Sequence, residues 1–242
     1  MKQPKVLVGF PTAESKDYCL DDFAKQVNTL TYSNYDVFCI DNSPNKNHVT
    51  KLWDRGIKAI HEPIKGNFRE ELARHQNIIK NYALSYGYDY LMMIESDVFT
   101  GESIIENLIA FSEVYGAGIV TATYEIAKED GEVLCLTSYD DRLRVRSEKI
   151  LPRESAFEVL GQGELLFDLA IKDPDVKLCA TGIGCTLFHS DVLKEVDFRV
   201  DLKTNPAAFS DTYYFTDAMN KGFRVMINSN LLVEHRKDSL IY

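Results

Sequence analysis

The chain has 242 residues, of which 45% are hydrophobic and 26% charged. This composition is enough for one substantial core and excludes an intrinsically disordered protein. The 27 basic and 37 acidic residues give a formal net charge of −10, so the surface as a whole repels polyanions and general nucleic-acid binding is not expected.

The sequence shows no targeting signal or membrane span. Its first apolar run, Val6 to Phe10 before Pro11, is too short for a signal peptide, and no later segment has the length and apolar character of a membrane span. The five cysteines are odd in number and contain no Cys-x-x-Cys pair, which favours a reducing compartment. We expect a cytoplasmic protein without an integral membrane segment, a location that permits peripheral work at a membrane.

The first 124 residues alternate between strand and helix patterns. Continuous apolar runs predict buried strands over residues 6–10, 35–40, 57–61, 90–94 and 118–124. Apolar residues at helical spacing predict helices over residues 20–30, 68–86 and 101–115, and a short helix ends at Gly56. This alternation predicts an α/β fold with a mostly parallel sheet flanked by helices.

The second half of the chain has a weaker pattern. Residues 125–175 read as an insertion of mixed strand and helix character. The alternation returns with a Gly-rich turn and strand over residues 180–189, a helix over 211–220 and a strand over 223–227. We expect one domain over residues 1–242, with a specialised second half.

Polar side chains follow three of the predicted strands. These clusters are Pro11-Thr12-Ala13-Glu14, Asp41-Asn42-Ser43 and Glu95-Ser96-Asp97. In parallel α/β sheets, ligands bind beyond the carboxyl ends of the strands. One crevice can therefore hold all three clusters.

The acidic triplet, Glu95-Ser96-Asp97, is the most informative of the three clusters about chemistry. Glu95 and Asp97 lie one residue apart directly after the apolar run that ends at Ile94, and two such carboxylates can converge on one hard divalent cation. A cation there would neutralise a departing nucleoside diphosphate. The alternative is that Asp97 caps the helix that begins near Glu102.

With these motifs in place, the chain resembles glycosyltransferase family 2, which has the GT-A fold. Residues 5–12, KVLVGFPT, are similar to the family's opening strand and the Pro-Thr pair beside the donor nucleotide. Residues 35–43, YDVFCIDNS, resemble the second strand, whose terminal Asp binds the base or ribose. Residues 72–77, LARHQN, resemble the Ala-Arg-Asn segment near the donor, and Glu95-Ser96-Asp97 takes the D-x-D place with Glu for the first Asp.

The likeness resumes near the C-terminus. Residues 181–188, TGIGCTLF, resemble the Gly-rich acceptor-side loop and the strand after it. Residues 210–215, SDTYYF, resemble the Glu-Asp-x-x-Phe segment that carries the catalytic base, with Ser210 in place of Glu. Glu234-His235 resembles the strand end whose His completes the metal shell in many members.

The resemblance implies a metal-dependent transferase, inverting by the partial family match, that moves a sugar from a nucleotide diphosphate donor. It makes residues 1–124 the nucleotide-binding half of the domain and residues 125–242 the acceptor-side half. Mn²⁺ or Mg²⁺ is the implied cofactor, and the acceptor class (glycan, lipid-linked, small molecule or protein) is not specified. Asp211 is the implied catalytic base, and Asp97 and His235 are the implied metal ligands. The residues that it places around the donor are Pro11, Thr12, Glu14, Asp41, Arg74, Glu95 and Ser96.

Several of these residues have structural alternatives. Asp211 can cap a helix, Asp41 can form an Asx-type turn before Pro44, and Arg74 can pair with Glu70. Two rival functions also stay open. A sugar-phosphate nucleotidyltransferase is disfavoured because residues 9–14 hold a single Gly and no basic residue, the next one along the chain being Lys16. A non-catalytic nucleotide-sugar binder has no need for both Asp97 and Asp211.

Overall fold

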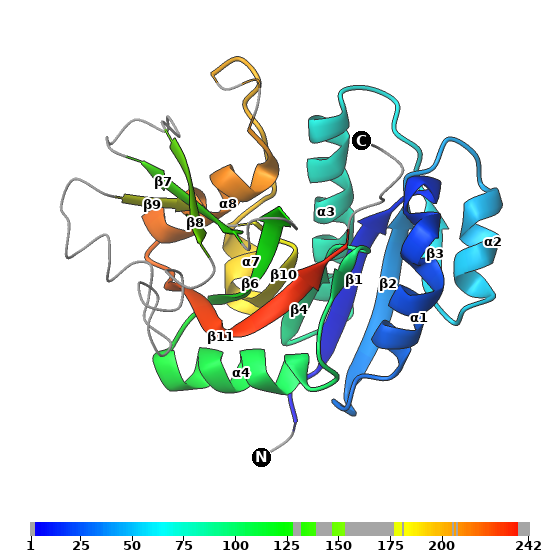
Figure 1. Cartoon of the computed structure of the whole chain (residues 1–242), viewed down its shortest axis with the longest axis horizontal. Coiled ribbons are helices and arrows are strands. Elements are labelled where there is room, and N and C mark those ends of the chain that lie inside the picture. The colour runs from blue at the N-terminus through cyan, green and yellow to red at the C-terminus, as the bar shows by residue number, and fades with distance from the viewer. Residues whose placement is uncertain are drawn as a thin grey trace.

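One continuous order of paired strands, β3-β2-β1-β4-β10-β6-β11-β5, organises the part of the chain that the structure describes (Figure 1). The structure is a computed structural model, and it describes residues 3–127, 132–138, 147–152, 177–180, 182–204, 206 and 208–236. The strands of this order are β1 (Val6–Thr12), β2 (Tyr35–Asp41), β3 (Lys58–His61), β4 (Tyr90–Ile94), β5 (Val98–Phe99), β6 (Ile119–Ala127), β10 (Cys185–His189) and β11 (Val225–His235).

Strands β3, β2, β1 and β4 run parallel to one another, so their carboxyl ends meet at one edge of the sheet. Strand β10 is antiparallel to both β4 and β6, whereas β6 and β11 are parallel. A smaller antiparallel group, β7 (Glu132–Ser138), β8 (Ser147–Pro152) and β9 (Lys177–Ala180), continues from β6. The rest of the predicted insertion over residues 125–175 lies outside the described residues.

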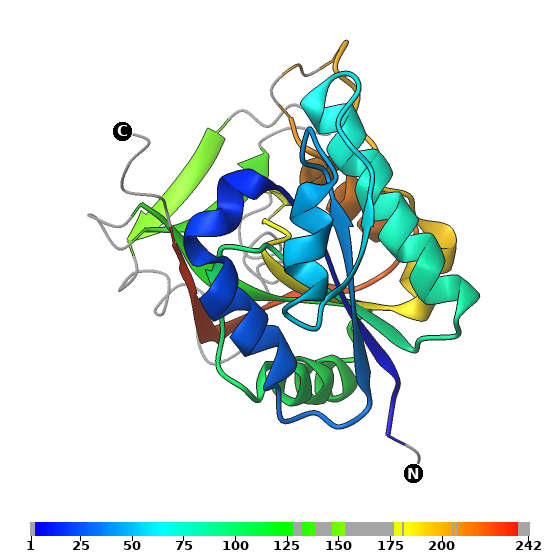
Figure 2. The same cartoon turned by 90° about the vertical axis from the view of Figure 1, so that its right-hand side faces the viewer.

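Helices cover both faces of the sheet (Figure 2). They are the 3₁₀ helix η1 (Glu14–Cys19), α1 (Leu20–Asn28), α2 (Asn47–Trp53), α3 (Phe68–Ser85), α4 (Ile104–Tyr115), α7 (Ser190–Glu195) and α8 (Ser210–Asn220). Because side chains alternate along a strand, Val8 and Phe10 of β1 pack with α1, α2 and α4, while Leu7 packs with α3, α7 and α8. None of the helices in the described ranges is both long and apolar enough to cross a membrane.

Gly9 sets the distance between the sheet and α3. A Cβ atom at this position would lie 2.3 Å from Cγ2 of Ile79, so only glycine lets α3 pack this closely on β1. The N-terminal end of this helix contributes Phe68 and Leu72 to the cavity at the carboxyl edge of the sheet.

The structure confirms most of the predicted elements and lengthens several of the strands. Strand β4 matches residues 90–94, whereas β1 continues through Pro11 to Thr12. Thr12 O accepts a hydrogen bond from Asn42 N on the β2 side, so the nitrogen of Pro11 points to the β4 side, where pairing has already ended at Gly9. The strand predicted over residues 223–227 runs instead from Val225 to His235, because it also pairs with β5.

Candidate functional site

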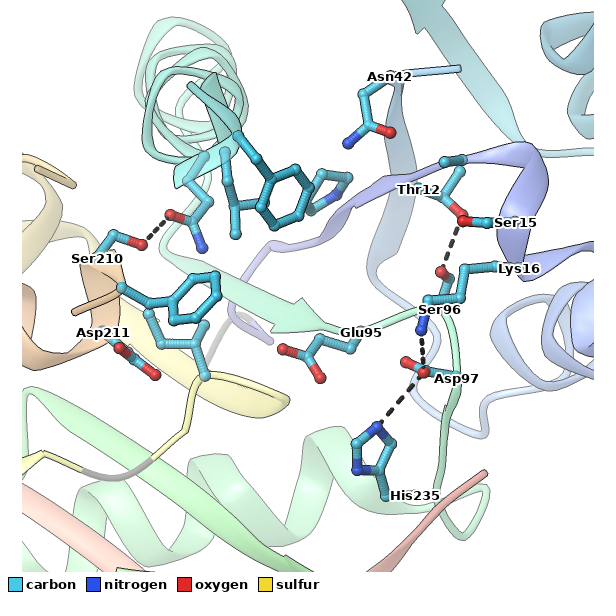
Figure 3. Close-up of a pocket in the computed structure, with 17 residues that line it drawn as sticks. Thr12, Ser15, Lys16, Asn42, Glu95, Ser96, Asp97, Ser210, Asp211 and His235 are labelled. Atoms are coloured by element: carbon cyan, nitrogen blue, oxygen red, sulfur yellow. Dashed lines mark hydrogen bonds and ion pairs between the residues drawn. The ribbon is translucent and has the colours of Figure 1, made fainter. Parts of the chain in front are cut away.

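A cavity of about 420 Å³ lies beyond the carboxyl ends of β1, β2 and β4 (Figure 3). It joins the two ends of the described chain, from Pro11 to His235. Its lining consists of Pro11, Thr12, Ala13, Ser15, Lys16, Asn42, Phe68, Leu72, Gln76, Glu95, Ser96, Asp97, Ile183, Phe209, Ser210, Asp211 and His235.

The acidic triplet is held by backbone hydrogen bonds on both sides. Glu95 N donates to Gly184 O at 2.9 Å, and Val98 N donates to Glu95 O at 2.9 Å, which closes a tight turn over the triplet. Strand β5 then begins at Val98. The proposed capping role of Asp97 is not what the structure shows, since α4 begins at Ile104 with Ser103 as its N-cap residue.

Pairing of β5 with β11 carries His235 to the triplet. His235 is in register with Val98, and Arg236 N donates to Asp97 O at 2.8 Å. The Nε2 atom of His235 lies 3.4 Å from Oδ2 of Asp97. A residue 138 positions later in the chain thus lies beside the strand-end carboxylates.

Glu95, Asp97 and His235 form a group that fits a divalent cation. One ligand atom from each of the three lies within 4.8 Å of the others. Carboxylate oxygens suit hard cations such as Mg²⁺ and Mn²⁺, and a single imidazole nitrogen is compatible with Mn²⁺.

The three side chains perturb one another's proton affinity. Glu95 faces the open cavity, yet the surrounding protein excludes much of the bulk water; this desolvation, with the charges of Asp97 and Asp211, raises the pKa of Glu95 to about 7. Burial acts to raise the pKa of Asp97, but hydrogen bonds from His235 and Lys16 outweigh it and lower that pKa. Burial acts to lower the pKa of His235, but its hydrogen bond to Asp97 outweighs that effect and raises it.

Asp97 also contacts two side chains from η1. Lys16 Nζ forms an ion pair with Oδ2 of Asp97. The hydroxyl of Tyr18 lies 3.4 Å from the same oxygen and donates to Arg236 O at 3.0 Å. We define Glu95, Asp97, His235 and Lys16 as the charged end of the cavity.

Thr12 and Ser96 connect the ends of β1 and β4. Thr12 Oγ1 donates to Ser96 Oγ at 2.8 Å, and both side chains are buried in the cavity wall. Pro11 lines the cavity beside them. These three residues, which the family resemblance places near the donor, therefore share one cavity with the charged end.

Asp211 approaches the cavity from α8, with Glu95 between it and Asp97 (Figure 3). The N-cap residue of α8 is Phe209, so Asp211 is a first-turn residue and does not cap the helix. Its neighbour Ser210 donates to Gln76 Oε1 of α3 at 2.5 Å, which holds the start of α8 against α3. The negative charge of Asp211 is close enough to Glu95 to contribute to its raised pKa.

Three residues expected near the donor have side chains outside the cavity lining. Asp41 is fully buried and accepts hydrogen bonds from Ser43 N, Ser43 Oγ and His48, which is the Asx-type turn considered as the alternative. The neighbouring Asn42 lines the cavity in its place.

Glu14 and Arg74 make contacts elsewhere. Glu14 is exposed, and its backbone N donates to Ser43 Oγ at 2.8 Å. Arg74 binds Glu62 and Glu71, and not the Glu70 that its helical spacing suggested. Their donor-binding roles have no support in this arrangement of side chains.

The cavity also has an apolar wall, which sequence reasoning did not identify as a group. We define it as Phe68 and Leu72 of α3, Ile183 of the loop before β10, and Phe209. The rings of Phe68 and Phe209 are 51% and 36% exposed and meet edge to face at 6.4 Å between centroids. Phe68 was predicted only as part of a helix face, and no spacing signal links it to Phe209.

The fold is that of known GT-A glycosyltransferases. The mannosyltransferase PcManGT from Pyrobaculum calidifontis, solved with GDP-Man and Mn²⁺, matches 100% of this chain and 59% of its own with 11% identity and a TM-score of 0.67. TarS from S. aureus matches 96% of this chain and 37% of its own with 12% identity and a TM-score of 0.55. Glucosyl-3-phosphoglycerate synthase from Mycobacterium tuberculosis, solved with phosphoglyceric acid, matches 98% of this chain and 74% of its own with 11% identity and a TM-score of 0.56.

These similarities confirm the predicted GT-A fold class. The chain spans 37% of the length of TarS and 59% of that of the mannosyltransferase, so the fold is shared over part of each of those proteins. No protein-family model matches the sequence, and no curated protein is recognisably similar to it in sequence.

Proposed function

We propose that the protein is a glycosyltransferase that binds a nucleotide diphosphate sugar with a divalent cation and transfers the sugar to an acceptor hydroxyl. One observation carries this proposal. Glu95, Asp97, His235 and Asp211, which come from three separate stretches of the chain, line a single cavity at the carboxyl edge of a GT-A sheet.

The charged end is the proposed site of the diphosphate. Asp97, His235 and Glu95 hold the cation there, and when bound it neutralises the charge that develops on the departing diphosphate. Asn42, Thr12 and Pro11 lie on the side of the cavity formed by β1 and β2, which is where we place the nucleoside. The mannosyltransferase with a similar fold was solved with GDP-Man and Mn²⁺, and TarS with UDP-GlcNAc, which supports the ligand class.

Asp211 is the proposed base. Its carboxylate would accept the proton of the acceptor hydroxyl as that oxygen attacks the anomeric carbon, while the bond to the diphosphate breaks and the diphosphate takes the electron pair. Attack from the side opposite the leaving group inverts the anomeric configuration. Asp211 lies on one side of Glu95, and Asp97 and His235 lie on the other, which agrees with such an arrangement (Figure 3). The apolar wall would contact the acceptor, because its member Phe209 lies two residues before Asp211 in the chain.

Hydrolysis of the donor tests the proposal without an identified acceptor, because water can replace the acceptor hydroxyl. The purified protein is incubated with a panel of UDP-, GDP- and other nucleotide sugars, with Mn²⁺, with Mg²⁺ or with EDTA, and the released nucleoside diphosphate is measured. We expect metal-dependent release from one donor class. Absence of both release and binding across the panel would remove the enzyme assignment.

A thermal-shift panel separates this function from the rival enzyme. Ligand binding to the native state raises the melting temperature. Stabilisation by a nucleoside diphosphate that requires metal supports the transferase, whereas stabilisation by a nucleoside triphosphate with a sugar phosphate supports a nucleotidyltransferase. The test is needed because Lys16 lies in the cavity, so a lack of basic residues after β1 no longer separates the two classes.

A further inference from the structure

The strongest observation outside the proposed roles is the position of Lys16. Its ammonium forms an ion pair with Oδ2 of Asp97, the same atom that lies 3.4 Å from His235 Nε2. The Asp97 side chain is only 5% exposed, whereas that of Lys16 is 39% exposed. The buried partner is therefore fixed, and the lysine reaches it from the solvent side.

Oδ2 is the Asp97 oxygen that Lys16 contacts and also the one that lies 3.4 Å from His235 Nε2, so a divalent cation held by Glu95, Asp97 and His235 would compete with Lys16 for it. Two positive charges cannot share one carboxylate oxygen at contact distance without strong repulsion. Lysine can leave without a backbone change, because its ammonium sits on a flexible four-carbon stem. Metal binding would thus release Lys16 into the cavity.

The charge balance of the cavity indicates where the released ammonium would go. The described lining contains three carboxylates, Glu95, Asp97 and Asp211, and Lys16 is its one lysine or arginine. A diphosphate that enters such an acidic cavity needs more positive charge than one divalent cation supplies. Ser15, next to Lys16 in sequence, and Ala13, three residues before it, line the same cavity, so a turned side chain stays within it.

We propose that Lys16 is an exchangeable ligand: it pairs with Asp97 until a divalent cation binds there, and then binds the diphosphate of the donor. Lys16 therefore opposes binding of the metal alone and favours binding of the diphosphate once the metal is in place. The cavity is biased toward taking up cation and nucleotide together. This inference rests on the proposed function of the cavity.

Isothermal titration calorimetry with Lys16→Met tests both halves of the exchange. In the first titration, MnCl₂ alone is added to the free protein, and Lys16→Met should bind Mn²⁺ about fivefold to tenfold more tightly than wild type. In the second, UDP or GDP, whichever wild type binds better, is added at saturating Mn²⁺, and Lys16→Met should bind it about tenfold more weakly. Lys16→Arg should keep the nucleotide affinity within about threefold of wild type, because the charge is retained.

Two controls separate this effect from a general change of charge or fold. Lys25→Met removes the same charge from an exposed position on α1 and should change neither affinity. The corresponding nucleoside, which lacks phosphate, should show no difference between wild type and Lys16→Met. Circular dichroism melts confirm that each variant is folded.

Opposite signs of the two changes are the signature of the exchange. Unchanged or weaker Mn²⁺ binding by Lys16→Met would mean that Lys16 only positions Asp97. Unchanged nucleotide affinity would mean that Lys16 does not reach the diphosphate. Either result overturns the inference, whereas the proposed function still stands if the wild-type protein binds Mn²⁺ and the nucleoside diphosphate. If wild type binds neither Mn²⁺ nor a nucleoside diphosphate, the proposed function fails and the inference fails with it.

Discussion

The charged end of the cavity and its apolar wall are held in place by different parts of the fold. Glu95, Asp97 and His235 follow or belong to strands, and backbone pairing of β4, β5 and β11 fixes where they lie. Phe68 and Phe209 lie at the starts of α3 and α8, with much of each ring exposed. Strand register permits little adjustment, whereas exposed rings at helix ends can move.

This difference separates two kinds of recognition. A cation and a diphosphate have the same shape in every nucleotide sugar, so the rigidly held Glu95, Asp97 and His235 can serve them all. An acceptor differs from enzyme to enzyme, and an adjustable wall at helix ends is where such variation is tolerated. We therefore expect loss of a metal-binding side chain from a strand end to weaken metal-dependent binding of the nucleotide, and changes in the packing behind the wall to leave metal binding intact.

Asp211→Asn gives the largest expected effect, and this effect is on turnover. It tests whether Asp211 acts in the reaction without taking part in donor binding. Asn cannot accept the proton of the attacking hydroxyl, so donor hydrolysis should fall about a thousandfold, while the nucleotide dissociation constant stays within about twofold. Release of nucleoside diphosphate and calorimetry measure the two quantities. Near-normal hydrolysis would assign the base to another residue, or would indicate a reaction that retains configuration.

Asp97→Asn should act on binding itself. The amide has lost the charge that holds the cation, so Mn²⁺-dependent nucleotide affinity should fall at least about a hundredfold. The matched control is Asp54→Asn, at an exposed position after α2, which should match wild type. Unchanged affinity in Asp97→Asn with an intact fold would remove Asp97 from the site.

The pH dependence of Mn²⁺ binding should follow the protonation of Glu95 and His235 at the charged end. A cation requires ionised Glu95, whose pKa is raised to about 7, and neutral His235, whose pKa is also raised; protons therefore compete with the metal below neutrality. Asp97, with its lowered pKa, stays ionised across this range. Mn²⁺ affinity should rise about tenfold from pH 6 to pH 8, and Glu95→Gln should make this rise shallower, leaving the part that His235 contributes. A flat profile in wild type would contradict Glu95 as a ligand.

Gly9→Ala should disturb the wall and leave the charged end as it is. The added Cβ would lie 2.3 Å from Ile79 Cγ2, so α3 must shift away from β1, and the free energy of unfolding should fall by about 1–3 kcal/mol. Denaturant titration measures the loss, and Mn²⁺ affinity of the folded protein should be unchanged. A large drop in Mn²⁺ affinity would show that the two regions are coupled.

The sequence predicted those parts of the site that depend on local pattern. An apolar run followed at once by two carboxylates locates Glu95 and Asp97, because a buried strand must end where charge begins. Asp211 was implied by the resemblance of residues 210–215 to the family's segment with the catalytic base. The alternation of strands and helices predicted the mostly parallel α/β sheet, and the family resemblance implied the GT-A fold.

Other features depend on pairing or on side-chain direction, which local pattern does not specify. Asp41 and Asn42 are neighbours at the end of β2, and only the structure shows that Asp41 turns inward to Ser43 and His48 while Asn42 lines the cavity. Arg74 turns to Glu62, which precedes α3. Lys16 reaches Asp97 because η1 follows β1 directly, and Phe68 meets Phe209 through contacts that no spacing in the chain encodes.

A crystal structure with Mn²⁺ and the preferred nucleoside diphosphate tests the central claim most directly, since the anomalous signal of manganese locates the ion without reference to the protein. The account predicts one manganese peak between Asp97 and His235, in contact with the diphosphate and on the side of Glu95 away from Asp211. A manganese ion and nucleotide bound elsewhere on the chain, with this cavity filled only by solvent, would contradict it.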